Sequence, residues 1–426
     1  MSDESARRRV LLCATTTGYQ TRMFDEAAAR LGVDLVLASD RCDRLEDPWR
    51  DRAIPVRFHD DAGAPAAVDA ALGPAPLHGV LAVGDRPAVL AARVAEARGL
   101  PWHTVDGARA GRDKWRFRAA QRAAGLMAPR GFVVEAGATT PEGVRYPCVA
   151  KPLVLSGSRG VIRADTPAAL TAALARVAAI LEAGDVRDLR DPAARQILIE
   201  DYVEGHEFAV EGLMTHGAFR ALAVFDKPEP LAGPFFEETI YVTPTARTRT
   251  DGAAVVAAVT AAARASGLYH GPVHAECRMS ASGVVVLEAA ARPIGGLCAR
   301  ALRLRDARGE EWPLEQDLLA HAIGRGREVT LAPGATGVMM VPIPRAGVLR
   351  AVEGVEAARA VAGVTEVSVT ATAGQILQAL PESASYLGFI FAQGAGDADV
   401  LAALAGAHAC LHFTIGTVRP LRRENA

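Results

Sequence analysis

Hydrophobic and polar positions in residues 1–112 alternate between two kinds of segment. Short apolar runs of strand length predict buried β-strands at 9–13, 33–38 and 79–83. Longer stretches with helical signals predict helices at 20–31 and 87–98, the second with Pro87 in its first turn and Gly99 as its stop. Strands that alternate with helices at this spacing are typical of a parallel, doubly wound α/β sheet.

The pattern changes after residue 112. Asp113 caps a predicted helix that ends at Gly125, and the residues that follow are rich in predicted strands, including an apolar one at 196–200. Beyond Pro333-Gly334 the predicted elements become short and mixed. We therefore expect an α/β domain at 1–112, a two-lobed core at 113–330 with lobes of about 113–203 and 204–330, and a small α+β domain at 331–426.

The bulk composition narrows the class of protein. Half of the 426 residues are hydrophobic and 23% are charged, a balance typical of a globular chain of several domains. The net charge is −2 and no basic run stands out beyond Arg7-Arg8-Arg9, which argues against nucleic acid as a partner. The six cysteines form no Cys-x-x-Cys pair, and no apolar stretch is long enough to span a bilayer. We expect a cytoplasmic protein without a membrane partner.

Lysine is scarce, and its positions are informative. Only Lys114, Lys151 and Lys227 occur among 47 basic residues, although lysine is normally a common residue. In a chain so rich in arginine, a lysine is expected where a compact point charge is needed. A GC-rich genome together with chance is the alternative explanation.

Several common nucleotide and hydrolase motifs are absent. None of the lysines follows a glycine, so there is no G-x-x-x-x-G-K-[ST] loop, and the sequence has no G-x-G-x-x-G, H-E-x-x-H or G-x-S-x-G motif. A nucleotide-dependent enzyme with this sequence would need a different binding scheme.

A β-hairpin is predicted around Ser280-Ala-Ser-Gly283, because an alternating run flanks this turn on each side. A turn centred near Ala281-Ser282 would place Glu276 almost opposite Glu288, and side chains two apart share one face of a strand. One face would carry His274, Glu276, Arg278, Glu288, Ala290 and Arg292. The other would carry Val273, Ala275, Cys277, Leu287 and Ala289.

The paired carboxylates of this hairpin suggest a metal site. Like charges on adjacent strands repel each other unless a cation lies between them. Magnesium prefers carboxylate oxygens together with substrate phosphates, so Glu276 and Glu288 are candidate ligands of Mg²⁺, or of Mn²⁺ in its place. Arg292 could take a phosphate or carboxylate through its planar guanidinium. A solvent-exposed polar face, with the carboxylates paired to Arg278, is the alternative.

In their order and spacing, these segments resemble the ATP-grasp superfamily, and within it most closely the L-amino acid ligases, which make dipeptides from unprotected amino acids. The resemblance covers nearly the whole chain. It is carried by Lys114, Lys151, the small-residue loop 156–160, the hinge 200–203, Glu207, Lys227 in Phe-Asp-Lys-Pro, and the hairpin with Glu276 and Glu288. It implies an N-terminal parallel-sheet domain, a two-lobed ATP-grasp core and a small C-terminal α+β domain.

The resemblance also implies an ATP-binding set. Its members are Lys114, Lys151, Ser156, Gly157, Ser158, Gly160, Glu200, Tyr202, Val203, Glu207 and Lys227. Lys114 and Lys151 would contact the phosphates from opposite lobes. The main chain around Glu200 and Val203 would pair with the adenine edge, and Glu207 would take the ribose hydroxyls.

Catalytic, metal and substrate residues follow from the same resemblance. Arg292 would steady an acyl phosphate and, with Lys151, would be catalytic, while Glu276 and Glu288 would bind the metal. In these ligases a glutamate in the loop after the third lysine receives the substrate α-amine, and Glu238 fits this position better than Glu237. The substrate residues would be Glu238, Tyr241, His274, Arg292, Gly295 and Gly296.

Two positions depart from the family pattern. Ala290 stands where many relatives have an asparagine that ligates the metal, and Tyr241 stands where a histidine is often found. These departures bear on the assignment of the substrate more than on the assignment of ATP chemistry.

The expected function is ATP-dependent ligation of a small-molecule carboxylate to an amine. An acyl phosphate would form first, and an amide, ADP and phosphate would be the products. An ATP-grasp carboxylase acting on bicarbonate or a purine intermediate is one alternative. A nucleotide-binding module without catalysis is another, which Ala290 keeps open. The substrates are expected to be amino acids, and a homodimer is an assembly that the sequence leaves open.

Overall fold

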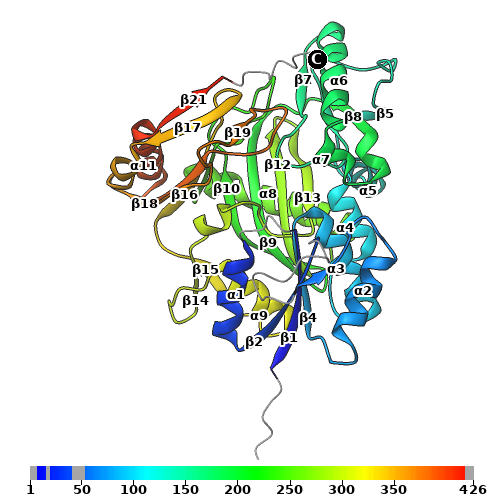
Figure 1. The fold of residues 1–426 in the computed structure, drawn as a ribbon, viewed down its shortest axis with the longest axis vertical. Coiled ribbons are helices and arrows are strands. Elements are labelled where there is room, and N and C mark those ends of the chain that lie inside the picture. Colours follow the sequence, from blue (N-terminus) through cyan, green and yellow to red (C-terminus); the bar gives the residue numbers. More distant parts are fainter. Residues whose placement is uncertain (1–6, 16–19, 41–52, 418–426) are drawn as a thin grey trace, which may run out of the picture.

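The computed structural model describes residues 7–15, 20–40 and 53–417. The N-terminal domain, the helix-rich lobe around α6 and the C-terminal strands surround a long central sheet (Figure 1). The predicted architecture, an N-terminal parallel-sheet domain, a two-lobed core and a C-terminal α+β domain, is confirmed. The exact domain boundaries stay predictions.

The N-terminal domain is built on a parallel sheet with the strand order β3-β2-β1-β4. Its strands are β1 (Arg8–Ala14), β2 (Val33–Ser39), β3 (Ile54–Pro55) and β4 (Gly79–Val83). Helix α1 (Gln20–Leu31) lies on one side of it, and α2 (Gly63–Leu72) and α3 (Asp85–Ala97) lie on the other (Figure 1). The three strands and two helices expected here are confirmed, with α3 beginning at Asp85 rather than Pro87. This start places Asp85 at the carboxyl end of β4.

The expected lobe at about 113–203, called the ATP lobe after the resemblance, follows the short helix α4 (Val105–Arg112) and begins with α5 (Lys114–Ala123). It contains an antiparallel sheet in the order β5-β8-β6-β7, made by β5 (Gly131–Glu135), β6 (Cys148–Pro152), β7 (Ile162–Ala164) and β8 (Gln196–Asp201). Helix α6 (Pro167–Leu181) packs on this sheet, and α7 (Gly184–Arg187) follows it. The inner strands β6 and β8 are almost wholly buried, so side chains near their ends are held rigidly.

A sheet of eight strands, in the order β13-β12-β9-β10-β11-β16-β20-β18, forms the centre of the molecule. The strands from the core are β9 (His206–Thr215), β10 (Ala218–Asp226), β11 (Ile240–Thr243), β12 (Gly271–Ser280) and β13 (Gly283–Ala290). Those from the C-terminal part are β16 (Ala335–Val341), β18 (Val364–Val369) and β20 (Gly388–Gly394). Because β11 pairs with β16 from Ile240–Met339 to Thr243–Thr336, one sheet runs across the expected boundary at residue 330.

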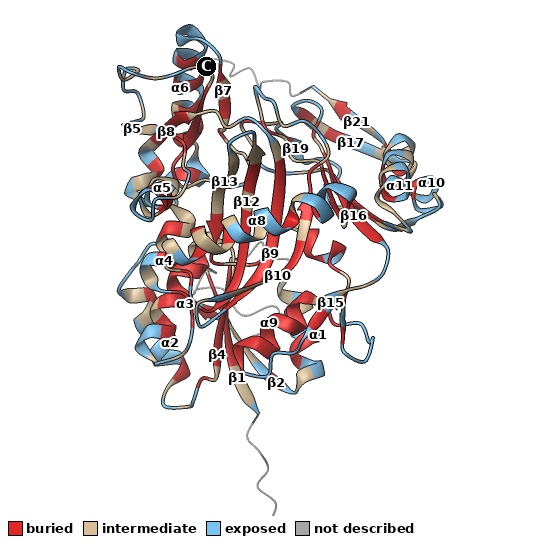
Figure 2. Cartoon of the chain, turned by 180° about the vertical axis from the view of Figure 1, so that it is seen from behind, coloured by how far each residue is buried: buried red, intermediate tan, exposed pale blue. Residues whose placement is uncertain are grey.

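Helices and smaller sheets complete the fold. Helix α8 (Ala246–Ala265) crosses the back of the central sheet, where β9 and β10 are largely buried (Figure 2). The remaining core elements are α9 (Leu314–Ala322), β14 (Leu304–Asp306) and β15 (Val329–Leu331). The remaining C-terminal elements are β17 (Gly347–Glu353), α10 (Val355–Arg359), β19 (Ile376–Leu377), α11 (Asp397–Cys410) and β21 (His412–Gly416). None of the helices in the described ranges is long and apolar enough to cross a membrane.

Candidate active site

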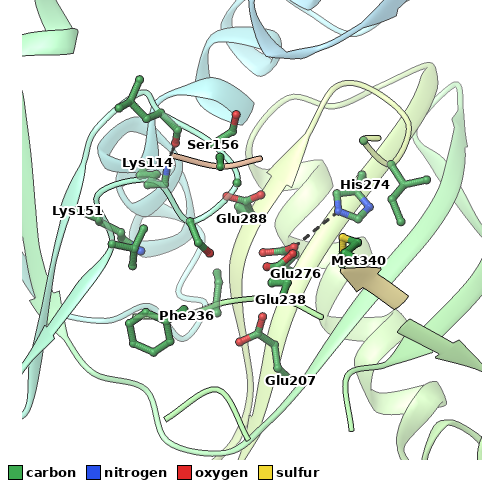
Figure 3. Close-up of a pocket in the computed structure, with 18 of the residues that line it drawn as sticks. Lys114, Lys151, Ser156, Glu207, Phe236, Glu238, His274, Glu276, Glu288 and Met340 are labelled. Carbon is green, nitrogen blue, oxygen red and sulfur yellow. Dashed lines mark hydrogen bonds and ion pairs between the residues drawn. The ribbon is translucent and has the colours of Figure 1, made fainter. Parts of the chain in front are cut away.

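A cavity of about 320 Å³ lies between the ATP lobe and the central sheet. Figure 3 shows Lys114 and Lys151 on one side of it, facing a row of glutamates on the other. Of the expected site residues, all except Gly160 and Lys227 line this cavity. The structure therefore brings together residues that lie far apart in the sequence.

On the ATP-lobe side, Glu200 holds Lys151 in place. Arg118 donates two hydrogen bonds to the Glu200 carboxylate, at 3.0 and 3.1 Å, and the Lys151 ammonium forms an ion pair with the same group. Burial alone would raise the pKa of Glu200, but the charges of Arg118 and Lys151 lower it to about 2. Glu200 therefore stays ionised and fixes two cations. Arg118 was not expected from the sequence, because nothing in its helical context marks it as buried.

Lys114 stands at the start of α5, whose first turn is capped by Asp113. The Lys114 Nζ donates a hydrogen bond of 2.6 Å to the carbonyl oxygen of Leu155, which precedes the small-residue loop. In that loop, Gly157 (φ +63°) lies so close to the C-terminal part that an added Cβ would be 2.8 Å from the Ala384 Cβ. The Gly160 amide donates to the Pro381 carbonyl at 2.9 Å, which turns it away from the cavity.

The hinge after β8 presents its backbone to the same cavity. The Tyr202 amide donates to the Pro147 carbonyl at 3.0 Å, and the Val203 carbonyl accepts from Arg278 at 2.8 Å. Arg278 also donates to Glu207 at 2.8 Å, so it ties the hinge to β9 and β12. It stays a prediction that the hinge pairs with adenine and that Glu207 binds the ribose hydroxyls.

Lys227 lies behind the cavity wall, surrounded by carboxylates. Its Nζ is 2.8 Å from Glu207, 2.9 Å from Glu238 and 3.0 Å from Glu276. Burial would lower the pKa of Lys227, but these three glutamates raise it well above its usual value. Lys227 is therefore a permanent internal cation that draws the three side chains together.

One cation does not neutralise this group of carboxylates. Burial first, and then the charge of Glu276, raises the pKa of Glu238 to about 7, against the opposing effect of Lys227. The Tyr241 hydroxyl donates to Glu238 at 2.7 Å. On the other side, burial would lower the pKa of His274, but its contacts with Glu211 and Glu276 raise it to about 9. The charges of His274 and Arg278 therefore add to that of Lys227, and Glu238 is the carboxylate of this group that they neutralise least.

The predicted hairpin and its register are confirmed, because Ser280 pairs with Gly283 and Glu276 pairs with Glu288. A β-bulge after Glu276 adds one residue to β13, since Cys277 pairs with Val286. Leu287 was expected on the opposite face, but it lines the cavity beside Glu288. The bulge explains this correction, because the extra residue interrupts strict alternation.

The arrangement of carboxylates fits a divalent cation. In the part of the chain that the structure describes, one group could hold a metal ion: oxygens of Glu207, Glu238 and Glu276, all within 4.8 Å of one another. Glu288 lies outside this group and, among the described side chains, has no hydrogen bond or ion pair within 4.0 Å. Carboxylate oxygens are ligands that Mg²⁺ prefers. Glu276 and Glu288 as its ligands remain a prediction.

Arg292 is held by a residue from another domain. Its Nε donates to the Asp85 carboxylate at 2.6 Å, and its Nη1 donates to the Pro293 carbonyl at 3.1 Å. Burial would lower the pKa of Arg292, but Asp85 raises it above its usual value, so the guanidinium stays charged. Asp85 was missed in the sequence, where nothing marks it as the partner of Arg292. Gly295 and Gly296 line the cavity beside Arg292, as expected.

The C-terminal part of the chain supplies a further wall that was not expected. Met340, Ala384, Tyr386 and Phe389 line the cavity together with Cys298. They carry no charge pattern or motif that marks a site. The pairing of β11 with β16 and of β16 with β20 brings Met340 and Phe389 to the cavity, and long-range pairings of this kind have no local sequence signal.

Comparisons with known proteins identify three parts of the chain. Residues 25–102 match the ATP-grasp N-terminal domain, 144–301 match the ATP-grasp domain, and 339–416 match the L-amino acid ligase C-terminal domain 2. A search of curated proteins gave no significant match.

Several solved structures share the fold. An L-amino acid ligase from Bacillus licheniformis is 24% identical, with a TM-score of 0.81 over 97% of this chain and 100% of that one. A phosphoribosylglycinamide synthetase from Anaerococcus prevotii is 14% identical, with a TM-score of 0.66 over 96% and 100%. An N5-carboxyaminoimidazole ribonucleotide synthetase from Thermotoga maritima is 13% identical, with a TM-score of 0.67 over 96% and 99%. At these identities the likeness concerns the fold.

Proposed function

Since this chain belongs to the ATP-grasp superfamily and has a C-terminal domain like that of the L-amino acid ligases, we propose that it is an ATP-dependent carboxylate–amine ligase. Its substrates would be amino acids and its product an amide, in the simplest case a dipeptide. One observation carries the proposal. A single cavity holds Lys114, Lys151 and Arg292 opposite the glutamates of the central sheet.

The cations of this cavity suit a nucleoside triphosphate. Lys151 is fixed by Glu200, and Lys114 lies on the same side of the cavity, at the start of the small-residue loop, so both ammonium groups could contact the phosphates of a bound nucleotide. Magnesium, held by Glu276 and Glu288, would supply charge neutralisation for the phosphates. Catalysis of phosphoryl transfer rests mainly on such positioning and electrostatic stabilisation.

The proposed reaction has two steps. A carboxylate oxygen of the first amino acid forms a bond to the γ-phosphorus of ATP while the bond to ADP breaks, which gives an acyl phosphate. The uncharged amine of the second substrate then attacks the acyl carbon, phosphate leaves, and the nitrogen loses a proton. Arg292 and Glu238 both line the cavity. Arg292 would stabilise charge on the transferring group, and Glu238 would receive an ammonium.

The acyl phosphate must be protected from water during this sequence. The loop 379–386 lies over the small-residue loop and closes the cavity on the C-terminal side. The Gly160 amide donates to the Pro381 carbonyl, and the Arg159 side chain donates to the Glu382 carbonyl at 2.9 Å. The phosphoribosylglycinamide synthetase and the N5-carboxyaminoimidazole ribonucleotide synthetase share the fold. The C-terminal domain match favours the amino-acid ligase over a carboxylase, and retention of Arg292 with the paired glutamates favours an enzyme over a passive nucleotide-binding module.

The test is ADP release measured with a panel of amino-acid pairs, with mass spectrometry of the products. We expect ADP and an amide only when ATP, Mg²⁺ and amino-acid substrates are all present. Robust ATP turnover with bicarbonate and no amino acid would favour a carboxylase instead. Nucleotide binding without turnover on any substrate would favour the non-catalytic module.

A further inference from the structure

The cavity has one wall that the proposed chemistry does not use. Met340 on β16 and Phe389 on β20 are direct partners across the two strands, so their side chains lie next to each other on one face of the sheet. Both line the cavity, and they are only 5% and 4% exposed. Tyr386 extends this wall, with its ring centroid 6.2 Å from that of Phe389. The Cys298 side chain also lines the cavity and is 3% exposed.

The strand register makes this wall continuous with the polar site. Tyr241 on β11 pairs with Val338 on β16, which in turn pairs with Phe391 on β20. Since side chains two apart share a face, Met340 and Phe389 lie on the same face as Tyr241. Tyr241 is the residue that donates to Glu238. Figure 3 shows Met340 close to Glu276, Glu238 and His274.

The wall carries no charge at neutral pH. Burial, and then the charge of Glu238, raises the pKa of the Cys298 thiol to about 12. Burial and Glu238 likewise raise the pKa of Tyr386 above its usual value. An acidic substrate side chain placed here would lose its hydration and would also be repelled by Glu238 and Glu276. An apolar side chain would instead gain from burial.

We propose that Met340, Tyr386, Phe389 and Cys298 form the side-chain subsite for the amino acid whose ammonium is received at Glu238. This amino acid has an uncharged, apolar side chain of the leucine, methionine or phenylalanine class. The inference rests on the proposed ligase function, and it adds the substrate class and the residues that select it. The C-terminal domain thereby determines specificity, while the core performs the ATP chemistry.

The test compares two phenylalanines on one strand. Phe389→Leu changes the wall, whereas Phe391→Leu makes the same change two residues away, on the same face, at a residue that is 4% exposed and does not line the cavity. Binding is measured by the thermal shift that leucine, phenylalanine, alanine and aspartate produce with ADP and Mg²⁺. Turnover is measured as kcat/KM for each amino acid with one common partner.

For the unaltered protein we expect leucine and phenylalanine to exceed aspartate by at least about 10-fold, both in affinity and in kcat/KM. A mismatch of one methylene in an apolar pocket changes discrimination by about 10- to 200-fold. Phe389→Leu should therefore reduce kcat/KM for phenylalanine at least about 10-fold more than for alanine. Phe391→Leu should leave the ratio between the two amino acids unchanged.

Three results would overturn the subsite: aspartate binding as tightly as leucine, an equal loss for all amino acids in Phe389→Leu, or the same change of ratio in both variants. Binding and turnover together separate the subsite from the ligase proposal. If the protein forms amides without preferring apolar amino acids, the ligase proposal stands and the subsite proposal fails. If leucine binds and Phe389→Leu weakens that binding, but no pair of amino acids gives an amide, the subsite proposal stands and the ligase proposal fails.

Discussion

At the scale of single residues, the glutamates of the cavity differ in the counter-ions they already have. Glu207 and Glu276 both contact Lys227, and Glu207 also accepts from Arg278. Glu238 shares Lys227 and keeps a raised pKa of about 7, with burial as the main cause. Glu288 has no such partner among the described side chains, although it faces the cavity. The same residue type is thus structural at one position and available to a ligand at another.

This difference leads to a prediction for Glu288→Ala. Among the described side chains, removing Glu288 breaks no hydrogen bond or ion pair. It relieves repulsion with Glu276 across the strands, so the melting temperature without metal should stay the same or rise. Charge neutralisation by a metal contributes several kcal/mol to phosphoryl transfer, so ADP release should fall at least about 100-fold. Near-normal turnover in this variant would show that Glu288 does not hold the metal.

A second prediction concerns Asp85, which positions Arg292 through the 2.6 Å hydrogen bond to its Nε. In Asp85→Asn the guanidinium keeps its charge, but its acceptor loses the opposite charge. A hydrogen bond to a charged group contributes about 1.5–3 kcal/mol, so kcat should fall about 10- to 100-fold while KM for ATP changes less. Asp69→Asn is the matched control, because Asp69 pairs with Arg98 in the same domain, away from the cavity. Equal effects of the two substitutions would contradict a positioning role.

At the scale of elements, the closure of the cavity depends on a contact between α6 and the loop 379–386. Arg176 on α6 forms a bidentate ion pair with Glu382, at 2.7 and 3.0 Å, next to the backbone bond from Gly160 to Pro381. The two side chains are 44% and 39% exposed. An exposed ion pair of this kind contributes less than about 1 kcal/mol. It can bias opening of the lobe without controlling the stability of the fold.

We therefore expect Glu382→Lys to increase ADP release that is not accompanied by amide, by about 2- to 5-fold, because water gains access to the acyl phosphate. The ratio of ADP to amide in each variant is the measurement. The exchanged pair Arg176→Glu with Glu382→Arg should restore the ratio. If the variant with the exchanged pair has the same raised ratio of ADP to amide as the single variant, the ion pair has no part in closure.

Elements with local signals could be predicted, and those with long-range causes could not. The parallel strands and the hairpin turn at Ala281-Ser282 follow from apolar runs and turn residues that lie next to each other in the chain. The bulge at Leu287 has no comparable signal, because an inserted residue disturbs alternation only once the strands are paired. Arg118 and Asp85 were missed for a similar reason, since their partners Glu200 and Arg292 are distant in sequence.

At the scale of the whole molecule, a group of histidines lies between the core and the N-terminal domain, away from the cavity. The ring centroids of His270 and His321 are 4.3 Å apart, and those of His216 and His270 are 4.7 Å apart. Among the described side chains, neither ring nitrogen of His270 has a hydrogen-bond partner. Burial, and then neighbouring imidazoles, lowers the pKa of His270 to about 4 and that of His321 to about 3.

These histidines should make the fold sensitive to acid. In the unfolded chain they bind protons near their ordinary pKa of 6.5, whereas in the fold they stay neutral until about pH 4 or 3. Stability is therefore complete above pH 6.5 and falls as the pH decreases toward these values. His270→Phe should flatten the loss of melting temperature between pH 7 and pH 5, while His412→Gln, at an exposed position, should not. Parallel curves for all three proteins would exclude this cause.

The pairing of β11 with β16 has a consequence for building hybrids of such chains. A chimera that takes its C-terminal domain from a relative joins two halves of a single sheet, with four residue pairs, Ile240–Met339 to Thr243–Thr336, at the junction. A slip of one residue there would turn Met340 away from the cavity and Met339 into it, because successive side chains face opposite sides. Transplanting a substrate preference therefore requires conserving strand register across the junction, whatever the length of the connecting segment.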